Sequence, residues 1–373
     1  MRIIHFSDTH LGFSDLDVVN SDGINMREAD FYKAFSDIID AILKEKPDFV
    51  IHSGDLFHRA SPTNRAITFA LSQIARLDSA KIPLILIAGN HEAPKSKALA
   101  PILKIFDSFK NVYVAYNQNA EIFEFKDINF YALPHINSEE TILKELERIE
   151  NSIDLDKKRV LIMHATVGAH YLMHEFGEWV YPKDKEYLFG MFDYVALGHW
   201  HGFSGLKKFN NVYYAGSSER TSSSDIRSNK GYISLKIENK LSVKHKAINL
   251  RKFLQFKIDA RKLESQLKEL DLSEVDGAIV EVTLRNLDIN LSIEIDNSYI
   301  ESFFENASFV KIKRELIQSS SGNIENVEAL TLQDYFLEHI DSQIEDIEQK
   351  ERVINKAKEL FSIVDVDSDG TNI

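Results

Sequence analysis

The stretch that decides the fold is Asp48-Phe49-Val50-Ile51-His52-Ser53-Gly54-Asp55. Its apolar run predicts a buried strand, and the glycine permits a tight turn that sets a carboxylate at the strand's end. Residues 2–6 and 83–88 repeat the arrangement, each run being followed by polar residues. Between these runs, residues 29–43 and 66–77 carry the apolar stripe of a helix. This alternation of strand and helix predicts an α/β fold.

Further along the chain, strands follow one another without helices between them. They are expected at residues 129–133, 159–163, 194–197, 212–215 and 231–237. Such an order predicts two packed sheets flanked by helices, together forming a domain over residues 1–250. No internal repeat is found.

A second α/β pattern begins near residue 251. Strands at 253–258, 278–284 and 309–314 alternate with helices at 263–270 and 298–304, which predicts a small domain over residues 251–318. A Ser-Gly-rich linker is expected at 319–326, followed by two C-terminal helices within 327–373. A calcium-loop-like run near the end, Asp365–Gly370, is too short to complete such a loop and indicates an acidic tail.

Composition excludes several classes of protein. Hydrophobic residues make up 44% of the 373 residues and charged residues 27%, as in ordinary globular chains and unlike disordered, collagenous or rod-like ones. The absence of cysteine excludes disulfides and thiolate metal sites. No apolar run reaches the length of a membrane span and no signal peptide is recognised, so a cytoplasmic protein without a membrane segment is expected.

The net charge of −14 has the wrong sign for a simple electrostatic binder of nucleic acid. Its distribution matters more than its total. Residues 327–373 hold 12 acidic and 4 basic residues, whereas residues 1–250 hold 32 acidic and 30 basic ones. The charge therefore does not exclude DNA as a substrate of the first domain.

Metal-binding residue types follow five of the expected strands, at the edge where ligands bind in α/β sheets. In extended chain, residues two apart point to the same side, so Asp-x-His and His-x-His can each offer two ligands. Oxygen and nitrogen donors without sulfur favour Mn, Fe or Zn, and four imidazoles make Mg less suited. Seven donors suit two ions that share a ligand, the usual device for displacement at phosphorus. The donors are Asp8, His10, Asp55, Asn90, His164, His199 and His201.

The pattern D-x-H, G-D, G-N-H-[DE], H and G-H-x-H resembles the calcineurin-like metallophosphoesterase superfamily. Within it, Ser7–Gly12, His52–His58 and Ala88–Glu92 resemble DNA double-strand-break repair nucleases of the meiotic-recombination-eleven or SbcD type. The resemblance implies a two-sheet metallophosphoesterase sandwich flanked by helices, a small α/β capping domain that recognises DNA, and C-terminal helices. It covers nearly the whole chain and is most specific in the first 220 residues.

The resemblance also implies a role for each matching residue. Asp8, His10, Asp55 and His201 would bind one Mn²⁺, and Asp55, Asn90, His164 and His199 the other, with Fe or Zn as alternatives. His91 would act as general acid or stabilise the transition state, and His58 would position the phosphate or His91. The implied activities are 3′–5′ exonuclease on double-stranded DNA and endonuclease on single strands, with attack by a water activated by two metals.

Candidate contact residues follow from the same comparison and from charge. Contacts to DNA phosphates are predicted for Arg59, Arg220, Lys207 and Lys208. His135, His170 and His174 lie in expected loops, and their role is left open. His5 is expected to be structural, and His52 to be structural or to support a metal ligand. The resemblance implies a homodimer through helices at 66–77 and 99–106. It also implies an SbcC-type coiled-coil ABC ATPase as partner, contacted by the apolar stripe Tyr335, Phe336, Ile340 and Ile344, and a nucleoid-associated location.

Two other functions stay open at this point. One is a phosphatase or cyclic-nucleotide phosphodiesterase on the same fold. Protein phosphatases of the superfamily have Asp-Arg-Gly after the Gly-Asp turn, however, whereas this chain has Leu56-Phe57-His58-Arg59. The other is a scaffold without activity, which the complete set of seven donors disfavours.

Overall fold

The structure, a computed structural model, describes residues 1–317 apart from 17, 94–99, 168–179, 223–224 and 226–227. The chain divides into two compact units. The first unit holds residues 1–258, 262–283 and 296–313; of the described residues, the second holds 259–261, 284–295 and 314–317. Every residue of the candidate site lies in the first unit.

The first sheet contains six strands in the order β12-β11-β1-β2-β3-β4. Strands β1 to β4 run parallel, and β11 and β12 add an antiparallel edge. Their bounds are β1 (Arg2–Phe6), β2 (Phe49–His52), β3 (Leu84–Ile87), β4 (Val112–Ala115), β11 (Gly231–Ile237) and β12 (Leu241–Ala247).

The second sheet also contains six strands, in the order β5-β6-β7-β8-β10-β9. Its central strands β6, β7, β8 and β10 are parallel, so their carboxyl ends meet at one edge. The bounds are β5 (Glu121–Glu124), β6 (Ile128–Leu133), β7 (Lys158–His164), β8 (Tyr194–Gly198), β9 (Ser204–Gly205) and β10 (Val212–Tyr214).

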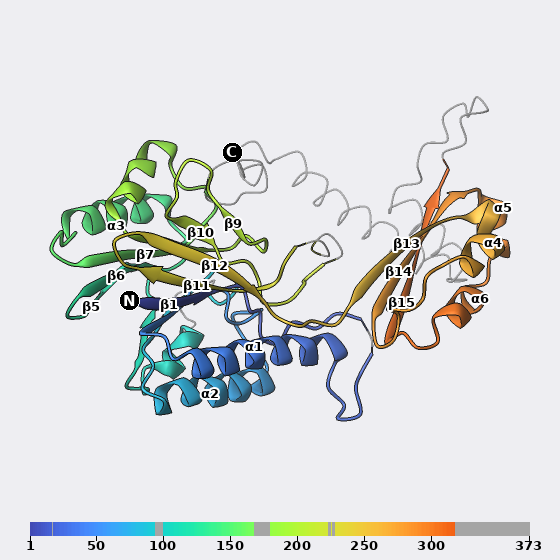
Figure 1. Ribbon diagram of the computed structural model, residues 1–373, viewed down its shortest axis with the longest axis horizontal. Coiled ribbons are helices and arrows are strands. Elements are labelled where there is room, and N and C mark those ends of the chain that lie inside the picture. The colour runs from blue at the N-terminus through green and yellow to red at the C-terminus, as the bar shows by residue number, and fades with distance from the viewer. Residues whose placement is uncertain (17, 94–99, 168–179, 223–224, 226–227, 318–373) are drawn as a thin grey trace, which may run out of the picture. The chain divides into compact units, whose positions relative to one another are not determined.

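Helices cover the outer faces of both sheets (Figure 1). The first sheet packs on α1 (Met26–Glu45) and α2 (Asn64–Ser79), and the second on α3 (Glu139–Asn151). Each helix begins at a capping side chain: Asn25, Thr63 and Ser138 accept from backbone N–H groups of the first turn. Two 3₁₀ helices, η1 (Ile102–Phe106) and η3 (Lys183–Met191), complete these layers.

Alternation along the strands separates three cores. Ile4 and Val50 face the α1–α2 layer, whereas their neighbours Ile3 and Ile51 face the second sheet. The core between the sheets is apolar on both sides, with Phe130 and Ile162 from the second sheet fully buried. The predicted sandwich of two sheets flanked by helices is therefore confirmed.

Residues after 250 form a three-stranded sheet of β13 (Phe253–Asp259), β14 (Ile279–Leu287) and β15 (Phe309–Leu316), in the order β13-β14-β15. The helical elements of this region are short. They are η5 (Ala260–Lys262), α4 (Leu263–Lys268), α5 (Ile289–Glu294), α6 (Asn297–Glu301) and η6 (Ser302–Phe304). The domain boundaries assigned from sequence, 251–318 and 319–326, stay predictions.

Among the described elements, the sequence missed β4, β5, β9, β12, α3, α5 and η3. Helix α3 carries a recognisable start, since Ser138 caps it and two glutamates occupy its first turn. The predicted helix at 99–106 is described from residue 100 onward, where it is the 3₁₀ helix η1. Among the described helices, none combines the length and apolar character needed to cross a bilayer.

Candidate metal centre

The loops after β1 and β2 are joined by backbone hydrogen bonds that align their functional residues. Asp8 N donates to Gly54 O at 3.0 Å and His10 N to Asp55 O at 3.0 Å. A further β-bridge pairs Leu11 with Phe57. The parallel register of β1 and β2 thus continues past the strand ends and holds Asp8, His10 and Asp55 together.

Two glycines are required here by close packing. Gly54 has a φ of +101°, and a Cβ built on it would overlap His164 Nδ1. A Cβ on Gly89 would overlap the Asp55 carboxylate. Any side chain at either position would displace a candidate metal ligand, which explains the Gly-Asp and Gly-Asn-His motifs physically.

Four of the seven predicted ligands adopt left-handed backbone conformations. The φ values are +51° for Asp8, +41° for His10, +57° for Asp55 and +96° for His199. Residues other than glycine rarely adopt such values, and each costs on the order of 1–3 kcal/mol. This strain lies at the residues that the sequence assigns to metal binding, as expected where a site dictates backbone shape.

The predicted ligands converge on a buried carboxylate. Asp55 Oδ2 lies 3.4 Å from His164 Nε2, 3.8 Å from His10 Nε2 and 3.9 Å from His91 Nε2. Ligand atoms of Asp8, Asp55 and His164 all lie within 4.8 Å of one another, as do those of Asp8, His10 and His201. Asp8 also accepts from His199 N at 3.0 Å.

Hydrogen bonds orient the imidazoles toward this cluster. His164 Nδ1 lies 2.9 Å from Ser53 O, a carbonyl that can only accept, so Nδ1 carries the proton. His164 Nε2 then presents a lone pair only 2.9 Å from Asn90 Oδ1. A cation bound by both atoms, a proton on Nε2, or an Asn90 amide turned so that Nδ2 donates would each satisfy this contact.

Other features of the cluster call for positive charge as well. His10 is almost fully buried, and its Nδ1 has no hydrogen-bond partner among the described residues. Burial lowers the pKa of His164, but the Asp55 carboxylate and the hydrogen bond to it outweigh burial and raise this pKa to about 10. The oxygen and nitrogen donors therefore fit divalent metal ions.

His91 stands beside the donors. Its Nδ1 donates to His58 O at 2.8 Å, which leaves Nε2 facing the Asp55 carboxylate. The His58 and His91 rings stack with centroids 5.2 Å apart. With 35% of its side chain exposed, His91 can be reached from solvent. His58, Arg59, Ala60, Asn90 and His91 line a cavity of about 360 Å³ at this point.

Glu92 connects two of the ligand loops, a role that the sequence did not suggest. Its buried Oε1 accepts from Leu56 N and from Gly89 N, both at 3.1 Å. Burial and the nearby Asp55 charge raise the pKa of Glu92 well above its usual value. Glu92 thereby holds the Asp55 turn against the Asn90 turn.

A partly buried network behind His201 was also missed. His201 Nδ1 contacts Thr221 Oγ1 at 3.0 Å and lies 3.6 Å from Asp225 Oδ2. Lys230, whose side chain is fully buried, donates to His201 O at 2.8 Å. No spacing rule connects these residues, because they meet only where the loop after β10 returns to β11.

The two histidines expected to be structural are buried. His5 contacts Tyr194 OH at 2.9 Å and Ser53 Oγ at 2.8 Å, which links the two sheets. His52 Nε2 lies 3.0 Å from Thr9 Oγ1. Through these contacts both rings hold loops that carry predicted metal ligands, at Ser53 and at Thr9.

The predicted DNA contacts differ in their surroundings. Arg59 is exposed beside His91. Arg220 donates to Arg251 O at 3.3 Å, and Lys208 pairs with Glu186 at 2.7 Å. Lys207 is exposed in the turn before β10. Arg59 is the one of the four that shares a described cavity with His91, and all four contacts stay predictions.

The apolar residues of the segments predicted to form the dimer contact, 66–77 and 99–106, are partly used in the chain's own core. Ile74, Leu103 and Phe106 are buried in the core under the first sheet, whereas Ile67 and Leu71 are half-buried. Several residues singled out from sequence lie outside the described residues, namely His170, His174, Leu99, the linker 319–326, and Tyr335, Phe336, Ile340 and Ile344 of the predicted C-terminal helices.

A family model described as calcineurin-like phosphoesterase matches residues 1–203, more than half of the chain and nearly all the residues of the metal centre. The chain belongs to the calcineurin-like phosphoesterase family. The superfamily resemblance drawn from the motifs is thus confirmed. In this family the site binds two metal ions, in agreement with the seven donors.

Curated relatives are named "DNA double-strand break repair protein Mre11". The chain is 33% identical to that of Thermoplasma acidophilum over 236 residues, covering 62% of this chain and 58% of the relative. It is 34% identical to that of Sulfurisphaera tokodaii over 202 residues, covering 54% and 49%. For Sulfolobus acidocaldarius the identity is 27% over 282 residues, covering 72% and 69%. The chain spans about half the length of the first two relatives.

Proposed function

We propose that this family member is a metal-dependent DNA nuclease that acts in double-strand-break repair. The observation that carries the proposal is the convergence of Asp8, His10, Asp55 and His164, whose carboxylate oxygens and imidazole nitrogens lie close enough together to hold metal ions. The names of the curated relatives support DNA as the substrate.

The proposed cofactor is a pair of Mn²⁺ ions per chain, with Fe or Zn as alternatives. Asp8, His10, Asp55 and His201 would hold one ion, and Asp55, Asn90, His164 and His199 the other. When bound, the ions would supply Lewis-acid polarisation of the phosphate and activation of water. Asp55 lies between the two sets, since its Oδ2 is within 3.8 Å of both His10 Nε2 and His164 Nε2.

His91 is proposed to move the proton to the leaving oxygen. Its Nδ1 is engaged with His58 O, so the ring cannot rotate without losing that bond. As an imidazolium, His91 keeps this bond and still has a proton on Nε2 to donate toward the cluster. His58, stacked on the same ring, is proposed to hold it in place.

The finer activities follow the resemblance. We infer 3′–5′ exonuclease activity on double-stranded DNA and endonuclease activity on single strands. We also infer a homodimer, a DNA-recognising domain at 251–318, and an SbcC-type ATPase bound through residues 327–373. A DNA substrate would place the protein with the nucleoid in the cytoplasm.

The test compares two substrates with and without metal. Purified full-length chain is incubated with end-labelled duplex DNA and with a phosphate monoester, in Mn²⁺ or in chelator. The proposal expects Mn²⁺-dependent DNA cleavage and little monoester hydrolysis. The pattern of labelled products reports the polarity. Monoester hydrolysis without DNA cleavage would instead support the phosphatase function. If neither substrate were hydrolysed, the result would support a scaffold protein without activity.

A matched pair of variants assigns any cleavage to this site. Asp55→Asn removes the shared carboxylate charge, whereas Asp193→Asn changes a carboxylate that pairs with Lys158 at 3.2 Å, away from the donors. Loss of cleavage in the first variant alone is expected. Equal activity of both variants would mean that the cleavage comes from a contaminant or another site.

A further inference from the structure

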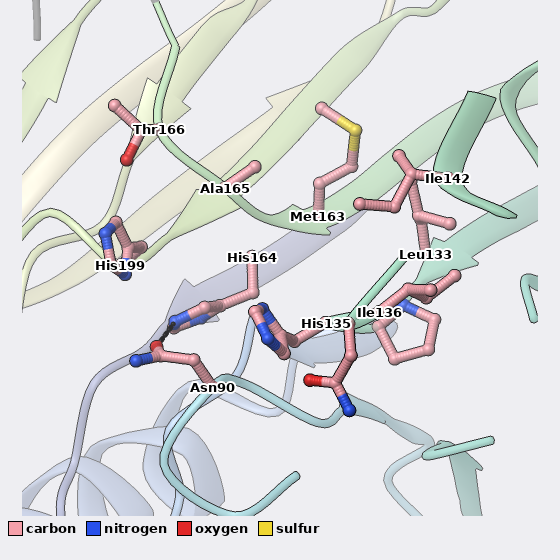
Figure 2. A pocket seen from close by; sticks show the side chains of 12 residues that line it. Asn90, Leu133, His135, Ile136, Ile142, Met163, His164, Ala165, Thr166 and His199 are labelled. Carbon is pink, nitrogen blue, oxygen red and sulfur yellow. Dashed lines mark hydrogen bonds between the residues drawn. The ribbon is translucent and has the colours of Figure 1, made fainter. Parts of the chain in front are cut away.

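A cavity of about 370 Å³ opens directly beside the metal centre. Three predicted ligands, Asn90, His164 and His199, form one of its walls (Figure 2). The other walls come from the end of β6, the end of β7 and the start of α3. Its size lies at the lower end of the range for ligand pockets, roughly 300–1,000 Å³.

The floor of the cavity is apolar. Leu133, Ile136, Ile142 and Met163 line it, and each is at most 4% exposed. No lysine, arginine, aspartate or glutamate is among the described lining residues. A flat apolar group would therefore be well accommodated against this floor.

The polar groups of the cavity could bind a flat aromatic ligand. Thr166 and Asn137 could form hydrogen bonds with the edge of its ring, and His135 could stack on the face. Thr166 is 3% exposed, and its hydroxyl has no hydrogen-bond partner among the described residues. An unpaired buried hydroxyl costs on the order of 1–3 kcal/mol, which a polar ligand edge would relieve. The Asn137 amide and the half-buried His135 ring complete the lining. The backbone N–H of His135 donates to Ala88 O at 2.8 Å, which fixes the loop that carries it.

We propose that this cavity receives the nucleobase of one of the two nucleotides that flank the scissile phosphate. The inference rests on the proposed nuclease function. Every base has a flat face for His135 and the apolar floor, so the contact tolerates any sequence. A hydroxyl and an amide can each donate or accept, so Thr166 and Asn137 can meet the edge of any base.

A base enters such a cavity only after leaving the helical stack. Leaving the stack costs a few kcal/mol and least at single-stranded or mismatched positions. Cleavage should therefore favour frayed or single-stranded nucleotides over those in a fully paired duplex. The cavity would thus select for DNA ends that are already unpaired.

Binding is tested first, without relying on cleavage. Full-length protein with Mn²⁺ is titrated with the 5′-monophosphate of 2-aminopurine deoxyriboside, whose fluorescence falls when the base stacks. Deoxyadenosine monophosphate should displace this probe at a concentration roughly 5- to 150-fold below that needed for 2-deoxyribose 5-phosphate, the range that base stacking provides. Equal potency of the two competitors would overturn the proposal.

Variants locate the effect in the cavity. His135→Ala should reduce the advantage of the base-bearing competitor, and His135→Phe, which keeps a flat ring, should restore it. Thr166→Val keeps the shape of the residue and should reduce binding of the base without altering that of 2-deoxyribose 5-phosphate. His245→Ala, at a half-buried histidine on β12, is the matched control and should bind like wild type. Loss of binding in the control as well, or no loss in His135→Ala, would contradict the proposal.

Cleavage provides the second arm. Single-stranded oligonucleotides carry a tetrahydrofuran abasic residue on the 5′ or the 3′ side of the scissile bond. The wild-type protein should cleave one of the two abasic strands more slowly than the intact strand. In His135→Ala, the cleavage rates of the abasic and the intact strand should be closer to each other. Equal cleavage of all three strands would refute the base cavity but retain the nuclease. Failure to cleave any strand would refute the nuclease, and the binding arm would still decide the cavity.

Discussion

Replacing Lys230 by methionine should destabilise the protein, because it removes a buried ammonium group and leaves the carboxylate of Asp225 without its charged partner. The Lys230 side chain is fully buried, and Nζ donates to His201 O and to Ser217 Oγ, both at 2.8 Å. The same atom lies 3.3 Å from Asp225 Oδ2. Methionine fills a similar volume but can satisfy none of these three oxygens.

The size of the effect follows from what remains after the substitution. Removing one partner of a buried ion pair costs about 3–5 kcal/mol, because the other charge is left uncompensated. Asp225 keeps its contacts to Thr221 Oγ1 at 3.1 Å and to His201, and 17% of its side chain is exposed. We therefore expect the lower end of that range, about 3 kcal/mol.

Lys246 on β12 provides the matched control, whereas Lys230 directly precedes β11. It also pairs with a carboxylate, that of Glu45 at 2.8 Å, but 42% of its side chain is exposed. Surface pairs of this kind contribute about 0–1 kcal/mol, so Lys246→Met should change stability little. Urea unfolding of the metal-free protein, monitored by circular dichroism, gives both free energies.

A second variant separates the lost charge from lost packing. If the cost arises from leaving Asp225 unpaired, adding Asp225→Asn to Lys230→Met should recover part of the stability. The metal affinity should fall as well, by roughly 10- to 100-fold, because the loop that orients His201 is no longer tethered. Equal stability of Lys230→Met and Lys246→Met would refute the reasoning.

Four further outcomes are expected. Asp55→Ala should lose both bound ions and DNA cleavage, measured by elemental analysis and by gel; retention of two ions per chain would move the bridging role elsewhere. His91→Ser should keep its metal but cleave DNA about 10²- to 10⁴-fold more slowly, the usual loss for a general acid. Chelation should lower the thermal unfolding midpoint of wild type, since ligands that bind only the folded state stabilise it, and leave that of Asp55→Ala unchanged. Deleting residues 327–373 should abolish co-purification with the ATPase while Mn²⁺-dependent cleavage of single-stranded DNA persists; a truncated chain that still binds the ATPase would contradict this.

The local patterns in the sequence predicted most of the fold. Helix α1 and strand β1 were found because their apolar residues recur with the period of the element, and this depends on near neighbours alone. The missed β4 and β5 are no shorter than β2 and β3, which were found, but β2 and β3 are buried almost throughout whereas β4 and β5 are partly exposed. They are defined by pairing with β3 and β6, which no local pattern expresses.

The metal ligands could be named from sequence because each follows a strand, and parallel strands end at one edge. The residues that surround these ligands could not be named from sequence. Glu92 and Lys230 act through contacts between chain segments that are distant in sequence: Glu92 reaches Leu56 across 36 positions, and Lys230 reaches the loop of His201 across 29. Such contacts leave no period and no spacing in the chain.

The sequence by itself determined most of the order of strands and helices, the identity of the predicted donors and the family resemblance, because these depend on residue type and short-range spacing. Only the tertiary structure decided which atoms face each other: the tautomer of His164, the unpartnered hydroxyl of Thr166, the buried ammonium behind His201 and the apolar cavity beside the metal ligands. The physical reason is that hydrogen bonds and cavities depend on distances of a few ångströms between segments that the chain brings together only on folding.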